Sequence, residues 1–202
     1  MSAEATQANL ASPLQSLGFE GSGNEALVLR DFSLARRAGV RGPGAREWLA
    51  SQGLPGDIAP NCISGGSDQA WVMALSQREF WLLHSDAAAS SQQPDSAALA
   101  AGAWPLYCQH SHAWLMLSGE PKAAMMAKLC GMDLTESVFP LGQVAQTQMA
   151  HVSVVIAHHD YQNEAVFSLF VDQSLAEYAA GALADAAGEF HRQGDWWHHR
   201  PL

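Results

Sequence analysis

The sequence predicts an α+β domain made of two similar strand–helix–hairpin–helix halves. The first observation behind this prediction is a pattern that occurs twice, at residues 40–49 and 117–126. In both copies an apolar strand end meets a glycine and a proline, and a short helix with a small apolar face follows. The second observation is a hairpin pattern after each copy, at residues 71–84 and 151–172. Hairpins that alternate with amphipathic helices are typical of helices packed on antiparallel sheets.

The first half begins with a predicted strand at residues 26–29. Pro43 suits the first turn of the next helix, because its missing N–H would have no helical partner there. Gly53 is predicted to close this helix in the left-handed conformation. Apolar segments on both sides of the polar turn 76–78 predict a hairpin, and a short helix is predicted at 96–103.

The second half repeats this order. A strand at 113–117 leads into a helix at 121–129, and apolar segments around the polar turn 160–164 predict the second hairpin. The last helix is predicted from a capping box formed by Ser174 and Glu177. Its apolar stripe comprises Leu175, Tyr178, Ala179, Ala182, Leu183, Ala186 and Phe190.

Composition divides the chain into three parts. Residues 1–24 are rich in Ala, Ser, Gln and Gly without any period, which predicts a flexible N-terminal arm. Residues 25–190 are predicted to form a single domain, with halves at about 25–86 and 110–190. Residues 191–202 form an aromatic, histidine-rich C-terminal tail.

Charge and cysteine usage exclude several classes of protein. The net charge of −10, with only 10 Lys and Arg residues, argues against binding to a phosphate backbone, so no nucleic-acid partner is expected. The hydrophobic fraction of 48% and charged fraction of 15% indicate a globular protein with little charged surface. The 3 widely spaced cysteines fit a reducing compartment. No signal peptide or membrane-spanning stretch is apparent, so we expect a cytoplasmic protein without a membrane partner.

Several motifs occur along the chain in a fixed order and spacing. They are Arg30-Asp31-Phe32-Ser33, Gly39-Val40-Arg41-Gly42-Pro43-Gly44-Ala45, Trp48-Leu49, Pro60-Asn61, the Leu75 to Leu83 hairpin with Glu79, Leu129-Cys130-Gly131-Met132-Asp133-Leu134, Phe139-Pro140-Leu141-Gly142, Gln146-Thr147 with Ala150, and Ser174 to Tyr178 ahead of Glu189-Phe190. Together these motifs resemble the gamma subunit family of heterotetrameric sarcosine oxidase. That family belongs to the folate-binding fold superfamily of the glycine cleavage T-protein, an aminomethyltransferase. The resemblance covers roughly residues 26–190 and implies a fold of the GcvT/YgfZ N-terminal type.

The resemblance implies an accessory subunit with a structural role and no active site of its own. FAD, FMN, NAD and tetrahydrofolate are then expected in partner subunits of the alpha, beta and delta types, with no cofactor, metal or catalytic residue in this chain. The assembly would demethylate sarcosine oxidatively and pass the one-carbon unit to tetrahydrofolate. This function belongs to sarcosine catabolism and one-carbon metabolism.

Two carboxylates are the candidate residues for a folate-type site. A buried acid at Asp31 or Asp133 could hydrogen-bond a pterin ring or poise an amine. The competing interpretation is local: Asp31 fixes a turn next to Ser33, and Asp133 follows a helix end.

Other reactive side chains carry weaker signals. His110 and His112 have the same-face spacing of a metal-binding pair, but the only further ligand type at a matching local spacing is Cys108. We therefore expect partly exposed strand histidines, and solvated turn histidines at His158 and His159. The cysteines lack a sequence neighbour that would lower a thiol pKa, and no serine sits in a glycine-flanked nucleophile elbow.

Two alternatives to the accessory subunit remain open from the sequence. One is a stand-alone tetrahydrofolate-binding, aminomethyltransferase-like protein that uses the groove between the two halves, with Asp31 or Asp133 as the acid. The other is a free-standing homo-oligomer that kept the fold after its enzyme partners were lost.

Overall fold

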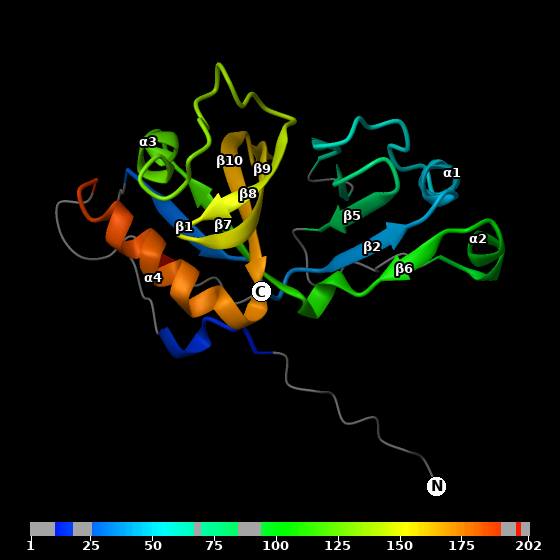
Figure 1. Ribbon diagram of the computed structural model, residues 1–202, viewed down its shortest axis with the longest axis horizontal. Coiled ribbons are helices and arrows are strands. Elements are labelled where there is room, and N and C mark those ends of the chain that lie inside the picture. The colour runs from blue at the N-terminus through cyan, green and yellow to red at the C-terminus, as the bar shows by residue number, and fades with distance from the viewer. Residues whose placement is uncertain (1–10, 18–25, 67–69, 85–93, 191–196, 199–202) are drawn as a thin grey trace, which may run out of the picture.

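The computed structural model describes residues 11–17, 26–66, 70–84, 94–190 and 197–198, which form two lobes side by side (Figure 1). Each lobe consists of a β-sheet with two α-helices. Within these residues, no helix is long and apolar enough to cross a membrane. Most of the predicted N-terminal arm and C-terminal tail lies outside the described residues.

The larger sheet has six strands in the order β11–β1–β7–β10–β9–β8. Neighbouring strands are antiparallel except β1 and β11, which are parallel. The strands are β1 (Val28–Asp31), β7 (His112–Ser118), β8 (Val144–Met149), β9 (Val152–Tyr161), β10 (Glu164–Asp172) and β11 (Trp197–His198). This lobe also contains α3 (Lys122–Met126) and α4 (Ala176–Ala187).

The smaller sheet has five antiparallel strands in the order β3–β4–β5–β2–β6. These strands are β2 (Arg37–Arg41), β3 (Cys62–Ser64), β4 (Trp71–Ala74), β5 (Glu79–Leu83) and β6 (Trp104–Leu106). Its helices are α1 (Ala45–Ser51) and α2 (Ser96–Ala100). Short 3-10 helices lie at η1 (Gln15–Leu17), η2 (Cys108–His110) and η3 (Gln173–Leu175).

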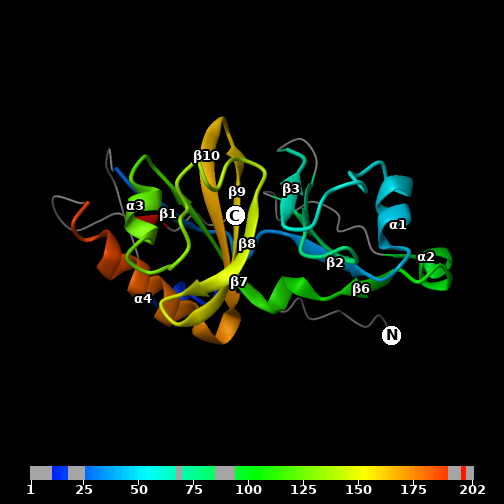
Figure 2. The same cartoon turned by 45° about the horizontal axis from the view of Figure 1, so that its top comes forward.

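The two sheets lie in the middle of the molecule and the helices lie outside them (Figure 2). Each sheet forms one hydrophobic core with its own helices, and a third, aromatic-rich core lies between the sheets. Strands such as β7 and β10 are therefore buried on both faces. Because neither face meets water, these strands are almost wholly apolar rather than alternating.

The two halves repeat one topology, and each gives its first strand to the other half's sheet. The orders β1–β7–β10–β9–β8 and β6–β2–β5–β4–β3 correspond strand by strand. In each half an entering strand is followed by a strand, a helix, three antiparallel strands and a second helix. β1 pairs in the sheet of the second half, and β6, which lies outside the predicted 110–190 half, pairs in the sheet of the first. The predicted halves are thus interlocked rather than separate.

Two glycines explain the pattern that occurs twice in the sequence. Gly42 and Gly119 end the equivalent strands β2 and β7 with φ angles of 133° and 110°. A Cβ atom on either would lie 2.0 Å from a backbone carbonyl oxygen, that of Gly102 or of Ala26 respectively. Those carbonyls stand just before the entering strands β6 and β1, so each glycine lets an exchanged strand approach closely.

The predicted helix-closing glycine, hairpin and short helix of the first half are confirmed, but Pro43 lies before α1 and not in its first turn, because the helix starts at Ala45 after the N-cap Gly44. Gly53 follows α1 with a φ of 72°, the left-handed conformation expected of a helix-closing glycine. The hairpin around the 76–78 turn is β4–β5, and the short helix predicted at 96–103 is α2.

The start of the last helix differs from the prediction. Ser174 and Glu177 do not form a capping box. Asp172 instead accepts hydrogen bonds from the Ser174 N–H (2.9 Å) and the Ser174 Oγ (2.6 Å), and α4 starts only at Ala176. The intervening 3-10 turn rotates Leu175 and Tyr178 off the buried stripe, and they are 39% and 53% exposed.

The prediction of a flexible arm is wrong for residues 11–17. Leu14 is fully buried in the core of the larger lobe. The Ser12 hydroxyl donates to the Asp31 carboxylate, and the Ser16 hydroxyl donates to Glu177. Long-range packing of one leucine, which local composition does not report, holds this segment on the domain.

Candidate functional site

Asp31 lies at the end of β1 and is only 5% exposed. Its carboxylate accepts hydrogen bonds from the Ser12 hydroxyl and from the Ser33 N–H at 2.8 Å. The Ser33 contact is the turn-fixing role considered from the sequence. Burial beneath the N-terminal segment places this acid in the wall of the larger lobe's core.

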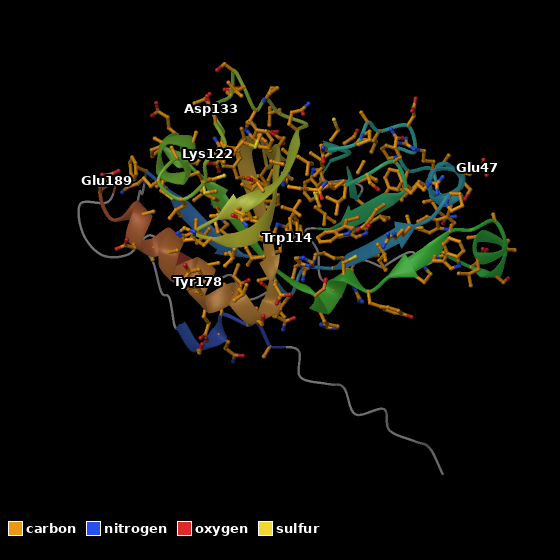
Figure 3. The ribbon with its side chains drawn as sticks, viewed as in Figure 1. Glu47, Trp114, Lys122, Asp133, Tyr178 and Glu189 are labelled. Atoms are coloured by element: carbon orange, nitrogen blue, oxygen red, sulfur yellow. The ribbon has the colours of Figure 1, made fainter. Side chains whose placement is uncertain are left out.

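Asp133 is exposed on the loop that follows α3 (Figure 3). It accepts hydrogen bonds from the Thr135 N–H at 2.9 Å and from Thr135 Oγ1 at 2.7 Å. These two hydrogen bonds hold the pKa of this carboxyl below its usual value. Its described hydrogen bonds are therefore those of a local loop cap.

The His110–His112 pair does not gather further ligands. His110 is exposed, and the His112 ring packs 4.9 Å from the Trp81 ring. Burial, together with the nearby Arg37 guanidinium, lowers the pKa of His112. Among the residues that the structure describes, no group of three or more His, Cys, Asp or Glu side chains could hold a metal ion.

His158 and His159 are buried in β9, not solvated in a turn as predicted, and are 2% and 4% exposed. The Trp114 Nε1–H donates to Ser168 Oγ at 2.8 Å, and His159 Nε2 lies 2.8 Å from the same oxygen. His159 Nδ1 lies 3.0 Å from the Asp160 carbonyl. These distances fit a neutral ring that donates from Nδ1 and accepts from the serine hydroxyl. Burial lowers the pKa of His159 to about 4.

His158 faces the other side of β9, toward the core of the larger lobe. Its Nδ1 lies 2.7 Å from the Phe139 carbonyl, and its ring stacks on Phe139 and meets Phe167 edge-on. Burial lowers the pKa of this imidazole as well. Both histidines are thus buried core residues, and the prediction of solvated turn histidines is wrong for both.

Arg37 is a buried cation that the sequence analysis did not single out. It is 3% exposed, and its Nη2 donates to the carbonyls of Ser33 (3.1 Å) and Gln109 (2.8 Å). Burial lowers its pKa to about 10. Arg37 is also a basic neighbour of Cys108, which the sequence analysis did not foresee, but burial outweighs it and raises the thiol pKa to about 11. This thiol is therefore protonated and unreactive near neutral pH.

The space between the two sheets, where a groove between the halves would run, is filled by aromatic side chains. Phe32, Trp71, Trp114, Tyr161 and Phe170 are all at most 7% exposed there. Their rings lie 5.2–6.2 Å apart in the Phe32–Trp114, Phe32–Tyr161, Trp71–Tyr161 and Trp114–Phe170 pairs. Trp114 lies near the middle of the molecule, between the lobes (Figure 3).

No protein-family model and no curated protein matches this sequence. Its fold, however, is similar to that of solved structures. One is a chain of heterotetrameric sarcosine oxidase from Corynebacterium sp. U-96, solved in complex with pyrrole 2-carboxylate. The TM-score is 0.70 and the identity 22%, over 92% of this chain and 98% of that chain.

A second similar structure is the glycine cleavage system aminomethyltransferase T from Bartonella henselae. The TM-score is 0.64 and the identity 16%, over 93% of this chain and 58% of that chain. This chain thus spans little more than half the length of the aminomethyltransferase. The two likenesses establish the fold: an α+β, aminomethyltransferase-like arrangement of two sheets.

Proposed function

We propose that this protein is an accessory, gamma-type subunit of a heterotetrameric sarcosine oxidase-like complex, with a structural role and no active site of its own. The main support for the proposal is that the structural alignment with the sarcosine oxidase chain covers nearly the whole of both chains. The alignment takes in 92% of this chain and 98% of that one, so the two have nearly the same length and one arrangement of elements. The aminomethyltransferase, by contrast, is much longer than this chain.

The chemistry of the described side chains supports a structural role. Asp133 is engaged by its loop, Asp31 by Ser12 and Ser33, and His159 by Ser168. Such contacts stabilise a fold. The serine–histidine pair among them, Ser168 and His159, is 0% and 4% exposed, so a substrate could not reach it. In the complex, partners of the alpha, beta and delta types would carry FAD, FMN, NAD and tetrahydrofolate, and this chain would contribute shape and buried area.

Co-expression with flavoprotein subunits of this kind from the same genome tests the proposal. We expect this chain to co-elute with them in size-exclusion chromatography, in equal molar amounts. The assembled flavoproteins should also show a lower melting temperature when this chain is left out, because an interface then goes unburied. Assembly of the other subunits while this chain elutes alone would refute the proposal.

The alternative is a stand-alone tetrahydrofolate-binding, aminomethyltransferase-like protein. The likeness to the aminomethyltransferase over 93% of this chain favours it. Calorimetric titration of the isolated chain with tetrahydrofolate separates the two functions. Micromolar binding that Asp31→Asn or Asp133→Asn abolishes would support the alternative, and no heat of binding supports the accessory subunit.

A further inference from the structure

The two sheets differ at equivalent edges. In the larger sheet the entering strand β1 is covered by β11. In the smaller sheet the equivalent strand β6 is the edge, and no strand of the described residues pairs with its outer side. Within the described residues, β6 therefore lacks the neighbouring strand that β11 provides for its counterpart β1.

Strand addition does not suit this edge. Pro105 lies opposite Val40 in the register. The Gly42 N–H donates to the Arg78 carbonyl beside β5, so by the two-residue alternation of an antiparallel ladder the Val40 backbone groups also face β5, and those of the opposing Pro105 face the outer edge. Proline has no N–H to donate, and β6 is only three residues long. A short edge strand with an outward proline is a common protection against strand pairing. Recognition at this edge must therefore use side chains.

The side chains beside β6 line an open groove of about 720 Å³, which we call the Trp104 groove. Its walls include Arg41, Arg78, Trp104 and Leu106. The indole of Trp104 rests against the backbone of Gly42, since a Cβ there would come within 2.7 Å of the ring. Trp104 as a whole is nevertheless 51% exposed. A large aromatic ring already held in place loses little conformational entropy when a partner packs on it.

Two arginines line the groove together with this indole, on a chain whose net charge is −10. The Arg41 side chain is 66% exposed, and its contact with Glu79 is long, at 3.8 Å. Arg78 is exposed in the β4–β5 turn. The groove therefore offers an apolar platform with positive charge beside it, which complements an acidic partner.

Two further exposed apolar side chains lie near Trp104 in the sequence. Leu99 on α2 and Tyr107 after β6 are 42% and 85% exposed. With Trp104 they make three of the seven large hydrophobic residues that are exposed in the described part of the chain. These three fall within nine positions of the sequence, and β6 and α2 both belong to the smaller lobe. An open groove with an exposed Trp and exposed Arg side chains in its walls fits a polypeptide rather than a small molecule.

We propose that the Trp104 groove docks an extended acidic segment of a larger partner subunit. An aromatic or proline side chain of that segment packs on the Trp104 indole, and carboxylates on either side of it meet Arg41 and Arg78. The proposal rests on the proposed function for the identity of the partner, and it adds the surface and the chemistry that are recognised.

The test uses the complex reassembled from the purified chain and the flavoprotein subunits, with dissociation constants measured by surface plasmon resonance. Trp104→Ala and Arg78→Glu should each raise the dissociation constant about tenfold or more. Arg78 is exposed, so its variant separates loss of binding from loss of folding, and melting temperatures check both variants. The controls are Arg36→Glu, the same charge change at an exposed position, and Leu141→Ala, an exposed apolar residue on the other lobe.

Salt and cross-linking give two further readouts. The wild-type affinity should fall as salt is raised from about 0.05 to about 0.3 M, because the Debye length shortens and screens the charge pairs. Arg78→Glu should flatten this dependence. A photoreactive residue at position 104 should cross-link to a partner segment rich in Asp and Glu. Normal binding by both groove variants, or a cross-link to a basic segment, overturns the docking proposal while the proposed function stands. Absence of any complex with the wild-type chain overturns both.

Discussion

One buried imidazole should make this protein measurably less stable at acid pH. His159 is 4% exposed and its pKa in the folded chain is about 4, against an ordinary value of 6.5. As the pH falls below 6.5, the unfolded chain binds a proton at this position before the folded chain does. The contribution of His159 to stability is therefore complete above pH 6.5 and is lost progressively down to about pH 4. Linkage gives a total loss of about 3 kcal/mol, of which about 2 kcal/mol is lost by pH 5.

Urea unfolding at pH 7.5 and pH 5.0 measures this loss as a change in the free energy of unfolding. His159→Gln removes the titrating group. The free energy of unfolding of this variant should therefore fall by about 2 kcal/mol less than that of the wild type between the two pH values. His110→Gln makes the same substitution at an exposed position and should retain the wild-type loss. Equal pH dependence in the wild type and His159→Gln would refute the argument, because burial would then not hold this ring neutral.

Three further predictions concern stability at neutral pH. Gly42→Ala should lower the free energy of urea unfolding by about 2 kcal/mol or more, because the new Cβ would lie 2.0 Å from a carbonyl oxygen. The control Gly131→Ala has open space around its Cβ and should be nearly neutral. Equal effects of the two substitutions would contradict the close-approach argument. Ser168→Ala should cost about 2–4 kcal/mol in the same assay because it leaves a buried indole N–H and an imidazole nitrogen without their partner, and a cost under about 0.5 kcal/mol would rule out that role. The double variant Ala150→Asn with His151→Gly should raise the free energy of unfolding by about 1 kcal/mol. Both turn residues have positive φ angles (49° and 68°), which Asn and Gly adopt more readily than Ala and His. A lower melting temperature of the double variant would contradict this prediction.

The sequence was most informative where a short stretch of backbone decides its own conformation. The glycine–proline pattern correctly predicted the ends of β2 and β7, and Gly53 correctly predicted the end of α1. Few residue types suit a position with a positive or fixed φ angle, so such positions are recognisable in a sequence. Polar turns between apolar segments reported the hairpins for the same reason. These signals depend only on neighbours in the chain.

Prediction failed where residue type and spacing allow more than one structure, and packing decides between them. His158 and His159 look like turn residues locally, yet β9 extends through them because β10 pairs with it as far as Tyr161. Ser174 and Glu177 have capping-box spacing, but in the structure the Ser174 N–H donates to the carboxylate of Asp172. Of the candidate site residues, Asp31 and Asp133 could be named from the sequence, whereas Arg37 could not, since only the packed structure buries it.

The sequence by itself determined the two-fold repeat of elements, the class of fold and the acidic, sparsely charged character of the chain. Each of these follows from local backbone preference or from composition. Only the tertiary structure decided that the halves exchange their first strands, that aromatic rings fill the space between the sheets and that Trp104 lies exposed beside two arginines. Strand pairing and burial are set by contacts between segments tens of residues apart, and a single sequence does not state which of its apolar segments will meet.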